Sequence, residues 1–285
     1  MRRCPISNGI NSMKPLVSVI IPTKNEERNI ARCLESVRRQ DYPGDKIEII
    51  VVDNFSTDKT KEIAREFAGS VFEKGPERSA QRNLGIEKAK GRYFIFLDAD
   101  MALSQNVISE CVSRMENDSG LVGLYIPEKM IGDGFWPKVR NFERSFYDET
   151  PIDGLRFIRT QAARSIGGFD EKLYAAEDWD FDKRLKPMGK TGIIKSPLYH
   201  NEEQFALRNY LRKKSYYTDN FGVYIRKWGN DDPDIKKQFG MYYRFIRVFA
   251  ERGKWKKIVR HPVLALGMYI LRFLVGVNYL LKRNG

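Results

Sequence analysis

The sequence predicts an α/β protein built on a mostly parallel, doubly wound sheet. Apolar runs typical of buried strands alternate with segments whose apolar residues recur at helical spacing. Polar side chains follow three of the predicted strands: Thr23, Asp53, and the pair Asp98 and Asp100. Because ligands bind at the carboxyl ends of the strands in such sheets, we expect a ligand site where these four residues meet.

The length and composition are those of a folded protein with a sizeable core. The chain has 285 residues, of which 42% are hydrophobic and 12% aromatic. Three scattered cysteines, Cys4, Cys33 and Cys111, suggest neither a disulfide framework nor a zinc site and are typical of a reducing compartment. Residues 1–14 are polar and predict a flexible tail without a secretory signal peptide.

Strands and helices are predicted from the period of the apolar residues. The expected strands cover residues 16–22, 46–52, 71–72, 93–97 and 121–126, and the expected helices lie around residues 30–37, 60–67, 79–89 and 107–115. The middle of the chain is less regular. Further strands are expected at 155–160 and 192–195, with a short helix that ends near residue 185.

The segment 93–100 runs from five apolar residues directly into two aspartates, Asp98 and Asp100. Side chains two apart on a strand point the same way, so the two carboxylates repel each other unless a cation lies between them. A hard divalent ion that also touches phosphate oxygens is the natural partner. For so short a pattern, a solvated aspartate pair in a turn is the alternative.

Positive charge is concentrated in the last third of the chain. Residues 201–285 hold 18 Lys and Arg against 7 Asp and Glu, and basic residues alternate there with aromatic ones. Such a segment can contact nucleic acid or an anionic membrane. The apolar run 262–281 is long enough to span a bilayer, but Arg272 and Asn278 interrupt it. We therefore expect helices that lie in the membrane interface, or an oligomer contact, rather than a spanning helix.

Six short motifs follow one another in an order and at a spacing that resemble a known family. They are residues 19–26 (VIIPTKNE), 51–58 (VVDNFSTD), 81–85 (QRNLG), 96–100 (FLDAD), 167–171 (GGFDE) and 177–179 (EDW). Each motif is weak alone. Together, over roughly residues 15–205, they resemble the family 2 glycosyltransferases, whose catalytic domain has the nucleotide-binding GT-A fold.

The resemblance implies a nucleotide-diphosphate sugar as donor. The residue that matches the family's base-binding aspartate is Asp53, and Pro22, Thr23 and Glu26 would line the same pocket for base and ribose. Arg82 matches a basic residue near the nucleotide and would contact the base or the diphosphate. Helix capping by Thr23 and Glu26, and a solvated Arg82, are the structural alternatives.

The resemblance also implies a metal ion and a catalytic base. Asp100 would ligate Mn²⁺ or Mg²⁺, Asp98 would contact the ribose, the metal or a metal-bound water, and His200 would complete the metal shell unless it is a structural histidine. Asp178 matches the family's base, which removes the proton of the acceptor hydroxyl in a single, inverting displacement. The alternative role of Asp178 is to cap a helix.

The acceptor side is the least defined part of the prediction. Glu177 and Trp179 adjoin the predicted base, and Lys213 and Lys214 could hold a phosphate of the acceptor. We expect a tail at residues 1–14, a GT-A catalytic domain at 15–205 and a basic helical extension at 206–285. The acceptor would be a saccharide or a polyprenyl-phosphate-linked glycan, used by a cytoplasmic enzyme that is peripheral on the inner face of the membrane. A homo-oligomer is compatible with the extension.

Two other functions account for less of the sequence. A nucleotidyltransferase would need a glycine- and lysine-rich triphosphate loop after the first strand, and residues 22–27 contain no glycine. A nucleic-acid-binding protein would use the basic extension, but this leaves the ordered acidic motifs unexplained, and we expect no nucleic-acid partner. Among donors, UDP-sugars are favoured, and GDP- and dTDP-sugars remain open because one aspartate suits several bases.

Overall fold

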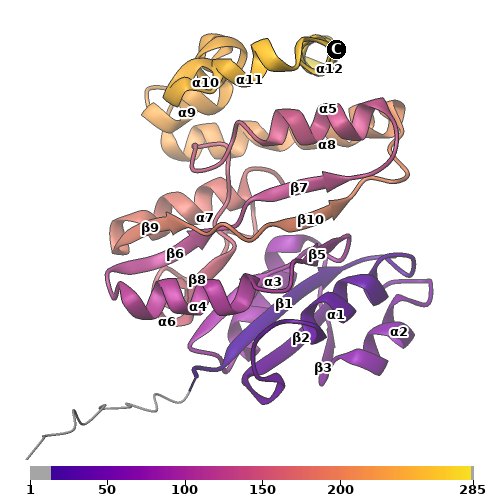
Figure 1. Ribbon diagram of the computed structural model, residues 1–285, viewed down its shortest axis with the longest axis vertical. Coiled ribbons are helices and arrows are strands. Elements are labelled where there is room, and N and C mark those ends of the chain that lie inside the picture. Colours follow the sequence, from indigo (N-terminus) through magenta and orange to yellow (C-terminus); the bar gives the residue numbers. More distant parts are fainter. Residues whose placement is uncertain (1–13, 284–285) are drawn as a thin grey trace, which may run out of the picture.

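The computed structural model describes residues 14–283 and shows a central seven-stranded sheet (Figure 1). Six of its strands run in one direction and the seventh, β8, is antiparallel to both of its neighbours, β4 and β6. The predicted α/β, mostly parallel sheet is confirmed, and the reversed strand was not predicted. In sheet order the strands are β3 (Ser70–Glu73), β2 (Ile47–Asp53), β1 (Val17–Thr23), β4 (Tyr93–Phe96), β8 (Phe157–Arg159), β6 (Leu121–Tyr125) and β9 (Lys190–Ile193).

Both faces of this sheet are covered by helices, which explains why its strands are apolar on both sides. The core on one face includes α1 (Ile30–Arg38), α2 (Thr60–Phe67) and α4 (Val107–Asn117). The core on the other face includes α3 (Arg78–Lys88), α6 (Thr160–Ser165) and α7 (Glu177–Leu185). Short 3₁₀ turns, Gly44–Lys46 and Lys186–Met188, lead into β2 and β9.

The register of the parallel strands aligns their carboxyl ends. Thr23 on β1 lies opposite Asp53 on β2, and Asp53 in turn lies opposite Glu73 on β3. On the other side of β1, the amide of Leu97 donates to the carbonyl of Ile20. The polar residues that follow these strands therefore collect at one edge of the sheet, as the sequence predicted.

A second, three-stranded sheet lies next to this edge. It consists of β5 (Met101–Leu103), β10 (Leu198–Asn201) and β7 (Glu128–Ile131), with β10 in the middle, antiparallel to β5 and parallel to β7. His200 is paired with Met101 on one side and with Met130 on the other. This pairing brings His200 next to the Asp98–Asp100 turn.

A layer of helices lies on the far side of the second sheet (Figure 1). Its core joins α5 to the C-terminal helices through Phe142, Phe146, Phe249, Met268 and Leu271. Although α5 precedes residue 205, it packs with this layer, and the division of the chain at 205 stays a prediction. The elements are α5 (Phe135–Arg144), α8 (Leu207–Trp228), α9 (Pro233–Phe239), the π-helical η3 (Tyr243–Arg247), α10 (Val248–Ala250), η4 (Glu251–Gly253), α11 (Trp255–Arg260) and α12 (Pro262–Arg283).

The last helix, α12, accommodates both polar interruptions of its apolar run through contacts within the protein. Arg272 Nη1 donates to the Tyr147 hydroxyl at 2.8 Å and pairs with Glu143 at 3.4 Å. Asn278 donates to the carbonyl of Leu211 on α8 at 2.9 Å. No helix in the described part of the chain is both long and apolar enough to cross a membrane.

The outer face of α12 is apolar and exposed. Val263, Leu266, Ile270 and Phe273 recur at helical spacing and are 46–67% exposed, whereas Met268 and Leu271 on the other face are buried. Exposed apolar side chains continue onto the neighbouring α11 as Trp255 and Val259, and onto η3 and the residues before it as Ile246, Met241 and Tyr242. We call the α11 and α12 part of this surface the apolar face.

Candidate active site

The predicted base-binding aspartate, Asp53, is fully buried at the end of β2. Its carboxylate accepts hydrogen bonds from the Ser56 amide at 2.7 Å and the Ser56 hydroxyl at 2.5 Å. Thr23 lies beside it, and the Thr23 carbonyl accepts from the Asn54 amide at 2.8 Å and the Gln81 side chain at 2.9 Å. The Thr23 hydroxyl oxygen is buried without a partner in the described structure, so it keeps a hydrogen bond for a ligand at this edge.

Glu26 lies between the sheet edge and the helical layer. Its carboxylate accepts from the Asn29 amide group at 2.7 Å. Burial raises the pKa of Glu26, the Asn29 bond opposes that shift, and the charges of Asp100 and Lys213 act on it in opposite directions. Pro22, in contrast, is a buried residue of β1 paired with Val52. These contacts place Glu26 near the second aspartate of the DxD motif.

The two aspartates of the DxD motif have different partners. They lie in a turn after β4, closed by a hydrogen bond from the Met101 amide to the Asp98 carbonyl, so the alternation of a strand does not apply to them. Asp98 pairs with Arg82 at 3.2 Å and with Arg156 at 3.3 Å. Burial raises the pKa of Asp98, but the two guanidinium groups outweigh burial and hold this pKa well below its usual range.

Arg82 connects the DxD motif to the predicted base. Its side chain is only 1% exposed, and Nη1 lies 2.5 Å from Asp178 Oδ1 while Nη2 contacts Asp98. The guanidinium lies over the rings of Phe96 and Phe169, at 5.3 and 5.2 Å from their centroids. Arg82 is therefore not a solvated surface residue, and it places two predicted site residues from distant parts of the chain next to each other.

Asp178 lies in the first turn of α7 and is 40% exposed, so its carboxylate is open to solvent on one side. Its other oxygen, Oδ2, makes no hydrogen bond to a described residue. Gly154 lies against this side chain, because a Cβ built there would be 3.4 Å from Asp178 Cβ. An acceptor hydroxyl can thus approach Asp178 while Arg82 holds Oδ1.

The predicted acceptor residues Glu177 and Trp179 both face the protein interior. Glu177 is 5% exposed and pairs with Arg78 at 2.9 Å, and burial raises its pKa. The Trp179 indole donates to the Ile152 carbonyl at 3.1 Å and stacks on Phe221 of α8 at 6.0 Å. Both residues fasten α7 to its neighbours, and a contact with the acceptor stays a prediction.

Asp100 and His200 lie next to each other, and a second carboxylate, that of Glu128, contacts His200 as well. His200 Nε2 lies 3.1 Å from Asp100 Oδ2, and Nδ1 lies 2.8 Å from Glu128 Oε1. Burial lowers the pKa of His200, but the two carboxylates raise it to about 10. Asp100 Oδ1 is buried without a hydrogen-bond partner among the described residues. The two carboxylates thus favour a positive charge on the His200 ring.

The donor set fits a divalent ion that shares its shell with a ligand. Mg²⁺ and Mn²⁺ take carboxylate oxygens, with imidazole as a further ligand for manganese, and Mg²⁺ usually keeps waters and phosphate oxygens in its shell. Asp100 offers an unpartnered oxygen, and His200 adjoins it. Among the described residues, no group of three or more His, Cys, Asp or Glu side chains is arranged to hold a metal ion. Asp98 in particular is turned toward Arg82 and Arg156.

The two lysines predicted to bind a phosphate lie on α8, and both are exposed. The charge of Lys213 acts on Glu26, so Lys213 lies near the edge of the sheet where the polar residues collect. Lys214 lies over the ring of Tyr210, 5.4 Å from its centroid. Desolvation and the charges of Arg140, Arg244 and Lys213 lower the pKa of Lys214 to about 8, against the effect of Glu143.

Three residues that the sequence analysis did not identify, Arg156, Glu128 and Arg144, form a network of ion pairs that contacts Asp98 and His200. Arg156 contacts Asp98 and lies 3.6 Å from Glu128, and Arg144 donates to Glu128 at 3.2 Å. Burial raises the pKa of Glu128, but Arg144, His200 and Arg156 together keep it low. No local pattern marks these residues, because their partners come from other strands and helices.

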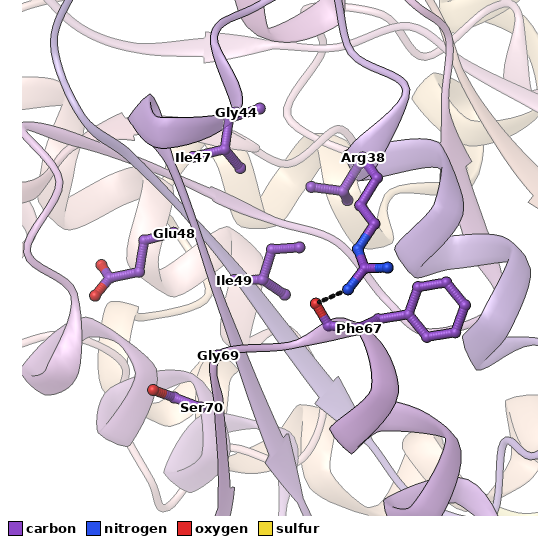
Figure 2. A pocket seen from close by; sticks show the side chains of 9 residues that line it. Arg38, Gly44, Ile47, Glu48, Ile49, Phe67, Gly69 and Ser70 are labelled. Atoms are coloured by element: carbon purple, nitrogen blue, oxygen red, sulfur yellow. Dashed lines mark hydrogen bonds between the residues drawn. The ribbon is translucent and has the colours of Figure 1, made fainter.

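A hollow at the opposite end of the sheet is not part of this site (Figure 2). It lies beside Ile47 at the start of β2, whereas Asp53 ends that strand. Its two charged residues are engaged: Arg38 donates to the carbonyls of Glu66 and Phe67, and Glu48 accepts from Ser18 and Lys90. We assign no ligand to it.

The motifs that converge on this edge match a described family. The model of glycosyl transferase family 2 matches residues 18–169, more than half of the chain. The chain belongs to glycosyl transferase family 2. The family predicted from the sequence is thereby confirmed.

Relatives and solved structures agree with the family. Over 195 residues the chain is 44% identical to glycosyltransferase AglE of Haloferax volcanii, which covers 63% of this chain and 64% of the relative. It is 25% identical over 247 residues to a dolichyl N-acetyl-α-D-glucosaminyl phosphate 3-β-D-2,3-diacetamido-2,3-dideoxy-β-D-glucuronosyltransferase of Methanococcus voltae, with 74% of each chain covered.

The predicted GT-A fold is confirmed by a structural likeness. The mannosyltransferase PcManGT from Pyrobaculum calidifontis, solved in complex with GDP-Man and Mn²⁺, superposes with a TM-score of 0.62 at 22% identity. The likeness covers 95% of this chain and 86% of the mannosyltransferase. It therefore extends past the sheets into the helical layer.

Proposed function

We propose that this glycosyltransferase moves a sugar from a nucleotide-diphosphate donor to a hydroxyl of a lipid-linked or cell-envelope glycan, with inversion and with the help of Mn²⁺ or Mg²⁺. One observation supports the proposal above the others. Arg82 holds the predicted base, Asp178, next to Asp98 of the DxD motif, with Arg78 and Glu177 behind them. A base and a diphosphate site side by side are what a direct displacement requires.

The donor would bind along the carboxyl ends of β1, β2 and β4. Asp53 would accept hydrogen bonds from the N–H groups of the base, with Pro22 and Thr23 lining the pocket and the Thr23 hydroxyl free for a ligand. Glu26 borders the ribose. UDP is the favoured nucleotide and GDP the second, since the structural relative binds GDP-Man. Arg82 would contact the diphosphate with its planar fork.

The residues that would hold the metal are Asp100 and His200, with Asp98 toward the ribose or a metal-bound water. A bound ion would supply Lewis-acid stabilisation of the negative charge on the leaving diphosphate. Asp178 would accept the proton of the attacking hydroxyl on Oδ2, the oxygen that Arg82 leaves open. Glu177 and Trp179 keep α7 in place, so that this carboxylate faces the site.

The apolar face supports a location at an anionic membrane. Trp255 and Leu266 represent its aromatic and aliphatic side chains, and Lys256, Lys257 and Arg260 border it on α11. This combination is complementary to a bilayer with anionic headgroups. We infer peripheral docking on the cytoplasmic leaflet, where a polyprenyl-phosphate-linked acceptor would be presented, as the name of the Methanococcus relative suggests.

The decisive experiment measures donor turnover with purified protein. UDP-, GDP- and dTDP-sugars are supplied with Mn²⁺ or with EDTA, to wild type, to Asp178→Asn and to the surface control Asp45→Asn, which lies at the other end of the sheet. Turnover of one donor that needs Mn²⁺ and falls about 10²–10⁴-fold in Asp178→Asn is expected. Nucleotide binding should persist in that variant, and Asp45→Asn should behave as wild type.

Two outcomes would contradict the proposal. Asp178→Asn with more than a tenth of the wild-type turnover would remove Asp178 from the role of base. Wild-type protein that binds no nucleotide sugar, with or without Mn²⁺, would contradict the assignment of the strand ends as a donor site.

A further inference from the structure

Four cations gather between the helices of the C-terminal layer. They come from four elements: Arg140 on α5, Lys214 on α8, Arg244 on η3 and Arg272 on α12. The charges of Arg140 and Arg244 act on Lys214, and the charge of Arg272 acts on Arg244. We call this set the cationic cluster. Two carboxylates, Glu143 and Glu202, lie among these cations.

Both carboxylates are already engaged by two of the cations. Glu202 accepts from Arg140 at 3.0 Å, and Arg140 also donates to the Tyr210 hydroxyl at 3.3 Å. Glu143 pairs with Arg272 at 3.4 Å. These pairs neutralise Arg140 and Arg272.

Arg244 has no such partner. Among the described side chains no carboxylate lies within ion-pair distance of its guanidinium, and its Nη1 is buried without a hydrogen bond. Its only described contact of this kind is with the ring of Tyr147, 5.7 Å away. Arg272 Nε is likewise buried without a partner. Burying an unpaired cation is costly, and an anion that accepts from these donors would offset the cost.

Lys214 is the exposed member of the cluster. Desolvation, Arg140, Arg244 and Lys213 lower the pKa of its ammonium to about 8, although Glu143 opposes them. Near neutral pH most of the ammonium is still protonated. A phosphate group placed here would face a protonated lysine and an arginine fork with unused donors.

The cationic cluster adjoins the candidate active site. Glu202, which binds Arg140, follows His200 by two residues, and Lys213 at the edge of the cluster acts on Glu26. On its other side, Arg272 belongs to α12, which carries the apolar face. An anion bound in the cluster would therefore lie between the membrane-facing helix and the Asp100–His200 pair.

We propose that the cationic cluster binds a phosphate group attached to the lipid of the acceptor, with Arg244 and Lys214 as its principal ligands. The inference rests on the proposed transfer to a lipid-linked acceptor and adds the site that would recognise it. A phosphate held here would leave the lipid chain directed toward α12 and the glycan directed toward Asp178.

The test uses farnesyl phosphate as probe, with farnesol and inorganic phosphate as comparisons, and full-length protein in detergent. We expect farnesyl phosphate to bind wild type and to raise its unfolding temperature, and farnesol at the same concentration to do neither. Arg244→Gln should bind farnesyl phosphate about 10- to 100-fold more weakly, since a charge-assisted hydrogen bond is lost. Arg247→Gln, an exposed arginine on the same segment, is the matched control and should bind as wild type.

Two further measurements separate binding from folding and from donor use. Because Arg244 is unpaired, Arg244→Gln without ligand should unfold at no lower temperature than wild type, which a merely structural arginine would not allow. Nucleotide binding with Mn²⁺ should be unchanged in this variant. Wild type that binds farnesyl phosphate but no nucleotide would contradict the proposed donor chemistry and leave the phosphate site standing.

Three results would overturn the site. Equal binding of farnesol and farnesyl phosphate would show that phosphate is not recognised. Wild-type affinity in Arg244→Gln would remove the cluster as its location. Binding of inorganic phosphate as tight as that of farnesyl phosphate would support a phosphate site but contradict its assignment to a lipid.

Discussion

The strand-end site and the cationic cluster differ in which charged group is left without a partner. At the strand ends, Arg82 is surrounded by Asp98, Glu177 and Asp178, and Asp100 retains an unpartnered oxygen. In the cluster Arg140 and Arg272 pair with carboxylates, and Arg244 retains an unpartnered nitrogen. The first site therefore keeps an unused carboxylate oxygen, and the second keeps an unused guanidinium nitrogen.

This contrast indicates which ligand each site is built for. Buried charges are normally paired, so an unpaired one that the fold maintains is a candidate ligand contact. The unpartnered carboxylate oxygen suits a cation, and the unpartnered guanidinium suits a phosphate. Donor and acceptor would thus complete opposite halves of one electrostatic arrangement.

The largest expected effect concerns the cation at the strand ends. Asp100→Asn keeps the shape of the side chain but removes the charge beside His200. We expect metal-dependent turnover to fall about 10³-fold, because metal stabilisation of the leaving group amounts to several kcal/mol. Turnover measured against Mn²⁺ concentration tests this expectation. A variant that reaches wild-type turnover at saturating Mn²⁺ would show that Asp100 is not a ligand.

The stabilities of two arginine variants sharpen the comparison directly. Arg82→Met removes the buried cation that contacts Asp98, Glu177 and Asp178 and should lower the free energy of unfolding by about 3–5 kcal/mol. Arg244→Met leaves no carboxylate unpaired and should cost far less. Urea unfolding measures both, with the exposed Arg39→Met as control, expected to change it by less than about 1 kcal/mol. Equal losses for Arg82→Met and Arg244→Met would contradict the contrast drawn here.

The smallest of these effects concerns the apolar face. Leu266→Asp should weaken binding to anionic vesicles about 10-fold or more, because burial of a leucine side chain contributes about 1.5–3 kcal/mol. Met188→Asp replaces a side chain that is 50% exposed on the η2 turn and should bind as wild type. Co-sedimentation with vesicles gives both values. If the two variants lose binding equally, net charge rather than the apolar face determines association.

Most of the sheet edge at the ends of β1, β2 and β4 could be predicted from the sequence. β1, β2 and β4 are buried on both faces, so their apolar runs are continuous and end sharply at polar residues. For the same reason the positions of Thr23, Asp53 and Asp98 at one edge followed from the strand boundaries and the parallel order alone.

The rest depends on contacts between distant segments. Nothing local shows that β8 runs against its neighbours, or that Arg82 meets Asp178, 96 residues further along the chain. The expectation that Asp98 and Asp100 share one cation assumed a strand, and the turn gave them different partners. α5 lay in a stretch that showed no clear period, and its partners are the C-terminal helices.

The contacts of α12 with the rest of the protein would set the distance between the proposed catalytic site and a membrane. Arg272 links this helix to α5, and Asn278 links it to α8, so the surface proposed to touch lipid is not on a flexible tether. On a membrane, a helix fixed in this way would hold Asp178 at one distance from the bilayer. The enzyme would then select acceptors by the distance between their reactive hydroxyl and the lipid. In glycans one sugar shorter or longer, this hydroxyl would not reach Asp178.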